Sequence, residues 1–322
     1  MPSSEGLLSF VSAGSKSKSN GSSRVDKNGA NDVHKITLTR SELLEAYHEM
    51  VRARYVDAKT IVLYKQNKCH FQIGVAGHEA VQVAAGKTFR ARKDWFYPYY
   101  RDMALCATLG MTDREFMLNA MNKAADPNSH GRQMPMHYGH KELRIVNQSS
   151  PTGTQLLQAT GCGLAIKRQK LDEVVYVSLG EGTCSQGDFH EALNWCAREK
   201  LPVIILVQNN KYAISVPVHE QLAGSSVYEI ASGYENLERA EIDGTDYLAS
   251  VSIMRAAHNR ALEGAGPTLI EAHVPRLQSH SISDNHLKYR SQGDIDQEQL
   301  RCPILRMEQY LISEKHANTK DL

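Results

Sequence analysis

The sequence predicts an α/β fold in which an open, mostly parallel sheet is covered by helices on both faces. Two runs of apolar, largely β-branched residues, 174–179 and 203–207, are bounded by turn residues and separated by a helical pattern. Such runs are typical of parallel strands that are buried on both faces. Residues 269–273 form a third run of this kind. The alternation of strands and helices is what this architecture requires.

Helices are predicted where apolar residues recur at helical spacing. The first opens with a cap candidate, Thr39 or Ser41, ahead of glutamates in its first turn. The second has Gly161 and Gly163 in its middle, small residues that permit close approach of a neighbouring backbone. The predicted helices cover residues 39–65, 154–169, about 185–200 and 304–312.

The chain divides into one folded domain and two tails. Residues 1–35 contain mainly Ser, Gly, Lys and Asn, so they are predicted to be a disordered tail that cannot bury enough surface to offset its ordering entropy. Residues 36–315 form the domain, and residues 316–322 a polar C-terminal tail. Within the domain, residues 126–150 are rich in Gly, Pro, His and Asn, which predicts a long surface loop near a site.

The composition excludes several classes of partner. Lys and Arg number 37 against 36 Asp and Glu, so the charge balance favours neither nucleic acid nor an anionic membrane. No apolar run approaches the roughly 18 residues that cross a bilayer. The scattered cysteines indicate reduced thiols in the cytoplasm. The mitochondrial matrix is the alternative, because the tail is rich in Ser and poor in acids. His130, His137 and His140 lie close together, but no pattern places them on one face as metal ligands.

The most informative residues follow the first two predicted strands. Gly180-Glu181-Gly182 follows one strand and Asn209-Asn210 follows the next. A βαβ connection makes these strands parallel, so Glu181 and Asn210 are expected at the same carboxyl edge of the sheet. Carboxylate, amide and backbone carbonyl oxygens suit Mg²⁺, while glycines and a helix N-terminus suit a diphosphate. The glycine turn alone would equally fit a plain loop, but the combination favours a site.

Several further segments resemble the E1 α subunits of 2-oxo acid dehydrogenases. Residues 191–194 (EALN) and 201–215 match the family, and residues 131–139 (GRQMPMHYG) and 149–155 (SSPTGTQ) are similar to its branched-chain subgroup. The resemblance covers nearly all of residues 40–310. It implies the thiamine-diphosphate-binding fold and an enzyme of the 3-methyl-2-oxobutanoate dehydrogenase (2-methylpropanoyl-transferring) type. Such an enzyme decarboxylates a branched-chain 2-oxo acid oxidatively and passes the acyl group to the lipoyl group of E2.

The resemblance also implies roles for individual residues. Mg²⁺ would be bound by Glu181, Asn210 and the Tyr212 carbonyl. His280, in a segment that resembles the family's active-site loop, is the expected catalytic residue, and Ser281 matches the position phosphorylated in mitochondrial relatives. A K⁺ site found in some relatives matches Ser149, Thr154 and Gln155. The residues implied to bind thiamine diphosphate are Tyr100, Arg101, Ser150, Thr152, Gly180, Glu181, Gly182, Asn210 and His280.

The chain also departs from the family pattern. Gln208 stands where branched-chain relatives often have arginine, so one phosphate contact is lost or supplied elsewhere, with Lys211 as a candidate. Relatives continue beyond residue 322, as expected if this chain is a fragment or a shortened α subunit. The expected partners are an E1 β subunit or fused β part, in an α2β2-like assembly, and the lipoyl domain of E2. The alternatives are a pyruvate or acetoin dehydrogenase E1 α subunit, or a non-catalytic scaffold.

Overall fold

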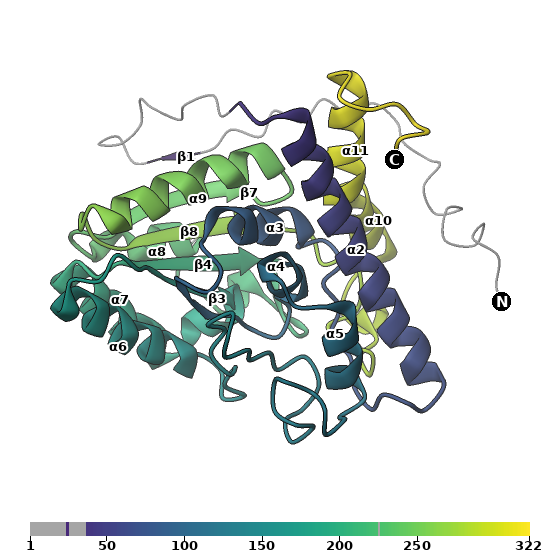
Figure 1. Cartoon of the computed structure of the whole chain (residues 1–322), viewed down its shortest axis with the longest axis horizontal. Helices are drawn as coiled ribbons and strands as arrows, with labels where there is room; N and C mark the ends of the chain where they lie inside the picture. The colour runs from purple at the N-terminus through teal and green to yellow at the C-terminus, as the bar shows by residue number, and fades with distance from the viewer. Residues whose placement is uncertain (1–23, 26–36, 225) are drawn as a thin grey trace.

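A six-stranded sheet lies between two layers of helices (Figure 1) in the computed structural model, which describes residues 24–25, 37–224 and 226–322. The strand order is β1-β7-β8-β4-β3-β2, and all strands but β1 run parallel. The predicted open, mostly parallel sheet is therefore confirmed. Apart from residues 24–25, the predicted tail of residues 1–35 lies outside the described residues. The strands are β1 (Arg24–Val25), β2 (Trp95–Tyr97), β3 (Val175–Gly180), β4 (Val203–Asn209), β7 (Glu238–Asp243) and β8 (Thr268–His273).

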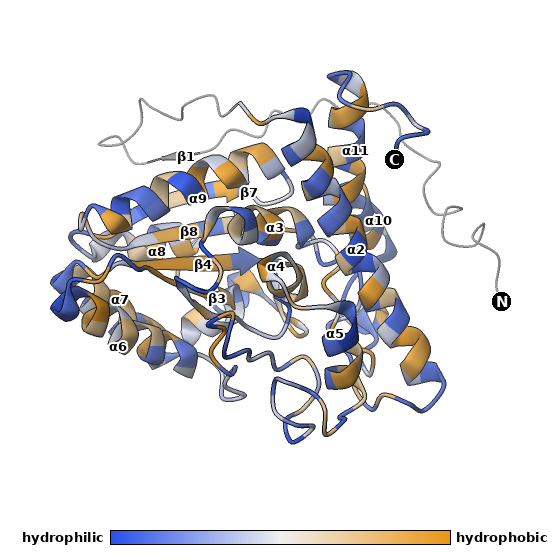
Figure 2. Ribbon diagram, viewed as in Figure 1, coloured by the Kyte–Doolittle hydropathy of each residue, from blue (hydrophilic) through white to orange (hydrophobic). Residues whose placement is uncertain are grey.

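The central strands are buried on both faces, which explains their continuous apolar sequences. In β4, Ile204 and Leu206 pack into one hydrophobic core, while Ile205 and Val207 pack into the other. This alternation follows from the pleat of a strand, which points successive side chains to opposite faces. Figure 2 shows the apolar colour of β3 and β4 between the two helical layers. The two faces thus form separate cores on one sheet.

Each core is covered by its own helices (Figure 1). One lies under α3, α4 and α9, with α2 and α11 packed beside them, and the other under α6, α7 and α8. The helices are α2 (Arg40–Lys65), α3 (Glu79–Thr88), α4 (Met103–Leu109), α5 (Asp113–Ala120), α6 (Thr154–Gln169), α7 (Gly187–Glu199), α8 (Val227–Ile230), α9 (Tyr247–Leu262), α10 (Gln292–Gln299) and α11 (Pro303–Ser313).

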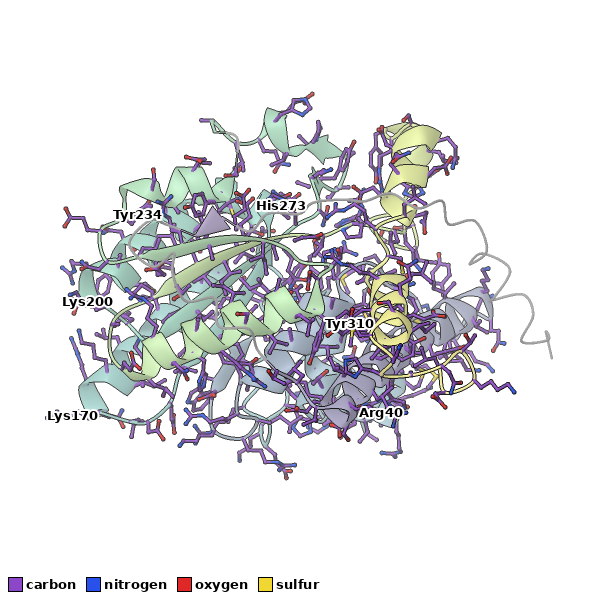
Figure 3. The ribbon with its side chains drawn as sticks, turned by 90° about the horizontal axis from the view of Figure 1, so that it is seen from above. Arg40, Lys170, Lys200, Tyr234, His273 and Tyr310 are labelled. Carbon is purple, nitrogen blue, oxygen red and sulfur yellow. The ribbon has the colours of Figure 1, made fainter. Side chains whose placement is uncertain are left out.

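The long helix α2 is stabilised at its start by a capping box. Thr39 Oγ1 accepts a hydrogen bond from the Glu42 amide at 3.2 Å, and the Thr39 amide donates to Glu42 Oε2 at 2.7 Å. Of the two predicted caps, Thr39 is therefore the one used. Arg40, labelled in Figure 3, donates from Nε to the His316 carbonyl. Ala317 and Leu322 pack against the core, so the residues predicted as a C-terminal tail lie against the domain.

The helices α3, α4, α5, α8, α9 and α10 were not individually predicted, and two strands and one helix start also differ from the sequence-based expectation. β7 was not predicted, because its sequence ERAEID carries charges and has only two fully buried side chains. β2 contains three residues, too few for a pattern. The helix predicted from about residue 185 begins at Gly187, because Glu181–Ser185 first form a 3-10 turn, η1. The α7 N-terminus is therefore not continuous with the glycine turn.

The fold also bears on the predictions about membrane spans, cysteines and the long loop. Within the described residues, no helix combines the length and apolar character that crossing a membrane requires. The six cysteines are all free, as expected for reduced thiols. Residues 126–150 form turns and isolated bridges rather than helix or strand, which agrees with the predicted loop.

Two glycines of α6 give a matched test of its packing on the sheet. A Cβ on Gly163 would lie 2.6 Å from Val203 Cγ2, whereas a Cβ on Gly161 would meet no atom within 4 Å. We expect Gly163→Ala to lower the free energy of unfolding by about 1–3 kcal/mol through overpacking. Gly161→Ala should instead raise it by roughly 0.5–1 kcal/mol, because alanine favours the helix. Urea unfolding followed by circular dichroism measures both, and equal shifts of the same sign would contradict this packing.

Candidate functional site

Glu181 and Asn210 meet at the carboxyl edge of the sheet, as the βαβ connection predicts. β3 and β4 pair with Gly180 opposite Gln208, so the two residues follow neighbouring strand ends. The backbone amide of Asn210 donates to Glu181 Oε2 at 3.1 Å, and the side chains of both residues are buried. In Figure 3, His273, the last residue of β8, lies at this edge, whereas Lys170 and Lys200, which follow α6 and α7, lie at the opposite end of the strands.

The Glu181 carboxylate has one oxygen that no group in the described part of the chain satisfies. Oε1 is buried and has no hydrogen-bond partner there. Burial raises the pKa of Glu181, although the nearby Arg276 and Arg101 act against this shift. Asn210 Oδ1 accepts from the Tyr212 amide at 3.2 Å, which holds Tyr212 close to the same edge. A buried carboxylate oxygen without a partner, beside an amide oxygen, is a donor set that fits a hard cation such as Mg²⁺.

The two glycines beside Glu181 differ in what their surroundings require. β5 (Tyr212–Ala213) and β6 (Val216–Pro217) form a small hairpin that packs on η1. A Cβ on Gly182 would lie 2.5 Å from Ala213 Cβ, so a side chain at this position would displace the hairpin. A Cβ on Gly180 would lie 3.8 Å from the Tyr99 ring, an ordinary contact. Glycine at 182 is therefore required for the approach of Tyr212 to Glu181.

Three buried arginines lie close to this edge of the sheet. Arg101, Arg276 and Arg290 are 2%, 1% and 5% exposed. Among the described residues none of them forms an ion pair with a carboxylate, and the Nε atom of each lacks a hydrogen-bond partner. Burial lowers the pKa of Arg276, and the charge of Arg101 adds to this shift. Unpaired buried cations are costly, so this arrangement fits an anionic ligand with several oxygens.

Arg276 and Arg290 were not among the predicted cofactor-binding residues. Arg276 donates from its terminal nitrogens to the Ile214 carbonyl at 2.9 Å and the Tyr289 hydroxyl at 2.8 Å. Arg290 donates to the Arg276 carbonyl at 2.9 Å, and both guanidinium groups lie over the Tyr212 ring. Arg276 comes three residues after β8, so its position after a parallel strand was the available signal.

Gln208 contributes to a buried hydrogen-bond network. Its amide nitrogen donates to Asp102 Oδ1 at 2.6 Å, and its amide oxygen lies 2.8 Å from His78 Nδ1 and 2.9 Å from Gln82 Nε2. Burial raises the pKa of Asp102 to about 6, against the effect of the hydrogen bonds that it accepts from Ser178 and Gln208. Lys211, the predicted replacement for an arginine at 208, is half-exposed with its Nζ 3.6 Å from Glu298. The buried cations without a carboxylate partner near this edge are therefore Arg101, Arg276 and Arg290, and Lys211 is not one of them.

His280 lies beside Arg101 and Tyr100. Arg101 approaches His280 Nδ1 at 3.5 Å and its carbonyl at 3.4 Å, and the Tyr100 ring contacts the imidazole edge-on. Burial lowers the pKa of His280 to about 4, and the charges of Arg101 and Arg276 add to this shift. The imidazole is therefore neutral near pH 7. Ser281, in the same loop, is buried and hydrogen-bonded to Ser283 at 3.1 Å.

The segment that precedes α6 places its polar residues in three environments. Thr154 Oγ1 donates to Ser149 Oγ and lies 3.2 Å from the Pro151 carbonyl, so Ser149 and Thr154 lie side by side. Gln155 instead donates from its amide nitrogen to the Ser178 carbonyl at 3.3 Å. Ser150 and Thr152 lie on an exposed turn, and the Ser150 hydroxyl contacts His137.

A second cluster with metal-binding groups lies on β7 and β8. Ligand atoms of Glu241, Glu271 and His273 all lie within 4.8 Å of one another. Glu271 already accepts from Asn209 Nδ2 and the Tyr228 amide, both at 2.7 Å, and His273 contacts Glu241 at 2.8 Å. All three groups therefore have hydrogen-bond partners within the chain, unlike Glu181 Oε1. The cluster therefore positions the first asparagine of the Asn209-Asn210 pair rather than competing as the metal site.

The chain is similar to known proteins of one family. Residues 47–322 match the family described as "Dehydrogenase E1 component". The chain is 41% identical to "2-oxoisovalerate dehydrogenase subunit alpha" of Bacillus subtilis, over 85% of this chain and 83% of that protein. It is 35% identical to "3-methyl-2-oxobutanoate dehydrogenase subunit alpha" of Mycobacterium tuberculosis H37Rv, over 82% and 69%. Identity to the mitochondrial "2-oxoisovalerate dehydrogenase subunit alpha" of Mus musculus is 32%, over 89% and 64%. The chain belongs to the dehydrogenase E1 component family.

Proposed function

We propose that this protein is the E1 α subunit of a branched-chain 2-oxo acid dehydrogenase, an oxidoreductase that acts on 3-methyl-2-oxobutanoate and related 2-oxo acids. The observation that carries this proposal is the unsatisfied Glu181 oxygen at the same sheet edge as three unpaired buried arginines. Such a site fits a metal-bound diphosphate, and the family uses thiamine diphosphate. The substrate class is supported by the relatives, which are named as 2-oxoisovalerate or 3-methyl-2-oxobutanoate dehydrogenase subunits.

In this proposal, Glu181, Asn210 and the Tyr212 carbonyl bind Mg²⁺. The Glu181 carboxylate supplies the charge, and Gly182 permits the hairpin that carries Tyr212 to approach. The diphosphate is held by the guanidinium groups of Arg101, Arg276 and Arg290, of which Arg101 contacts Tyr100 and His280. Bound in this position, thiamine diphosphate supplies the electron sink that decarboxylation of a 2-oxo acid requires.

His280 is the proposed catalytic residue for transfer of the acyl group. Because its imidazole is neutral near pH 7, the resting site holds no further cation beside Arg101, and the unprotonated ring nitrogen can accept a proton as a general base. Ser281 is proposed as a phosphorylation site. A phosphate there would place a dianion in the loop that also holds His280 and Asp284, which are joined by a hydrogen bond of 2.9 Å. Ser149, Thr154 and Gln155 are proposed to hold K⁺.

The proposed partners are an E1 β subunit and the lipoyl domain of E2. The diphosphate side of the site is buried in this chain, whereas Ser150 and Thr152, proposed to contact the pyrimidine side, are exposed. A second chain that covers this turn would complete the cleft and exclude water from the reaction. We further propose a cytoplasmic location, which is supported by the bacterial sources of the two more identical relatives named above.

The metal assignment can be tested with Glu181→Gln. The variant keeps the shape of the side chain but loses the charge, so the Kd of thiamine diphosphate at fixed Mg²⁺ should rise about a hundredfold. Without ligands the variant should be at least as stable as the wild type, since an unpaired buried charge is removed. Isothermal calorimetry of the α–β complex measures the affinity, with Glu220→Gln, an exposed carboxamide substitution, as the control. Unchanged affinity in Glu181→Gln would exclude this residue as a metal ligand.

The substrate class can be tested by turnover of the reconstituted α–β enzyme. We expect kcat/KM for 3-methyl-2-oxobutanoate to exceed that for pyruvate by at least about tenfold, because each additional buried methyl group of the substrate contributes binding in a fitted pocket. Acetoin should be the poorest of the three substrates. Faster turnover of pyruvate or acetoin would contradict the branched-chain assignment, and no turnover of any substrate would favour a non-catalytic subunit.

A further inference from the structure

A buried histidine outside the proposed reaction scheme supports the exposed turn of the site. His137 is 6% exposed, and its Nε2 lies 2.6 Å from Ser150 Oγ. Its other ring nitrogen, Nδ1, lies 3.4 Å from the Pro135 carbonyl. The turn lies beside η1, because a Cβ on Gly153 would be 3.4 Å from the Thr183 side chain. Gly153, three residues after Ser150, therefore lies next to the segment that begins with Glu181.

The contacts of His137 determine which group donates in its hydrogen bond with Ser150. A carbonyl oxygen can only accept, so the hydrogen of the ring lies on Nδ1, toward Pro135. Burial lowers the pKa of His137, so the ring is neutral near pH 7 and Nε2 carries no hydrogen. The Ser150 hydroxyl must then donate to Nε2. The lone pairs of the Ser150 oxygen then remain available to accept a hydrogen bond from a ligand.

We propose that His137 fixes Ser150 as a hydrogen-bond acceptor, and that the site thereby selects a cofactor ring bearing an amino group. This inference rests on the proposed function, in which the turn of Ser150 contacts the pyrimidine side of thiamine diphosphate. The exocyclic amino group of that pyrimidine donates hydrogen bonds, which an accepting oxygen can bind. An oxo group in its place would face the Ser150 oxygen as a second acceptor. His137 is a positioning residue, because it acts through Ser150.

The test is the ratio of two dissociation constants, for oxythiamine diphosphate, in which an oxo group replaces the amino group, and for thiamine diphosphate. Displacement calorimetry on the α–β complex with Mg²⁺ measures both. Ser150→Ala removes the acceptor and His137→Phe frees the Ser150 hydrogen, so each should lower the ratio by about tenfold. Ser185→Ala is the matched control, since it removes an exposed hydroxyl from η1 that donates to Gln221 at 3.4 Å. Its ratio should equal that of the wild type.

Other results of this ratio measurement would overturn the proposal or the proposed function. A lower ratio in Ser150→Ala with a wild-type ratio in His137→Phe would overturn the proposal, because Ser150 would accept without the histidine. Equal weakening of both ligands in the two variants would also overturn it, since that result indicates only a structural role. If the wild-type complex binds neither ligand, the proposed function fails first. That failure is distinguishable, because it is seen before any substitution is made.

Discussion

Buried charges without partners at the carboxyl edge of the sheet are the constraint on which the rest of the structure depends. Arg101, Arg276 and Arg290 have no carboxylate partner among the described residues, and Glu181 has an oxygen without a hydrogen-bond partner. Each isolated charge costs on the order of several kcal/mol in a protein interior. A fold retains such groups only where the surrounding structure holds them rigidly and a ligand compensates them. The family and the donor types both fit a metal-bound diphosphate as that ligand.

The scaffold holds part of the site through one segment, residues 72–75, which connects Arg101 to the loop of His280. The Gly74 carbonyl accepts from Arg101 at 2.7 Å, and the Gln72 carbonyl accepts from the Ile282 amide at 2.9 Å. Asp57 anchors the segment from α2, where it accepts from the Gln72 side chain and from the Val75 amide at 3.3 Å. Burial raises the pKa of Asp57 to about 6, because the charged form of this carboxyl group loses its hydration inside the protein. Arg101, on the proposed diphosphate side, and the loop of His280 are therefore held by the same segment.

Much of the fold and the central part of the site could be predicted from the sequence, because their signals are local. Continuous apolar runs predicted β3, β4 and β8, and strand ends that share an edge predicted the meeting of Glu181 and Asn210. β7 was missed because its charged sequence does not show that it pairs in parallel with β8. Arg276, Arg290 and the His137–Ser150 contact were missed as well. Their roles depend on distances between segments far apart in the sequence, which no local pattern encodes.

The most direct test of the central claim is a calorimetric titration of thiamine diphosphate, with and without Mg²⁺, into this chain alone and into its complex with an E1 β subunit. Unpaired buried arginines and an unpaired buried carboxylate predict binding that requires both Mg²⁺ and the partner that covers the exposed turn at Ser150. Tight binding that is unchanged when Mg²⁺ is removed, or no binding by the complex under any condition, would contradict the claim.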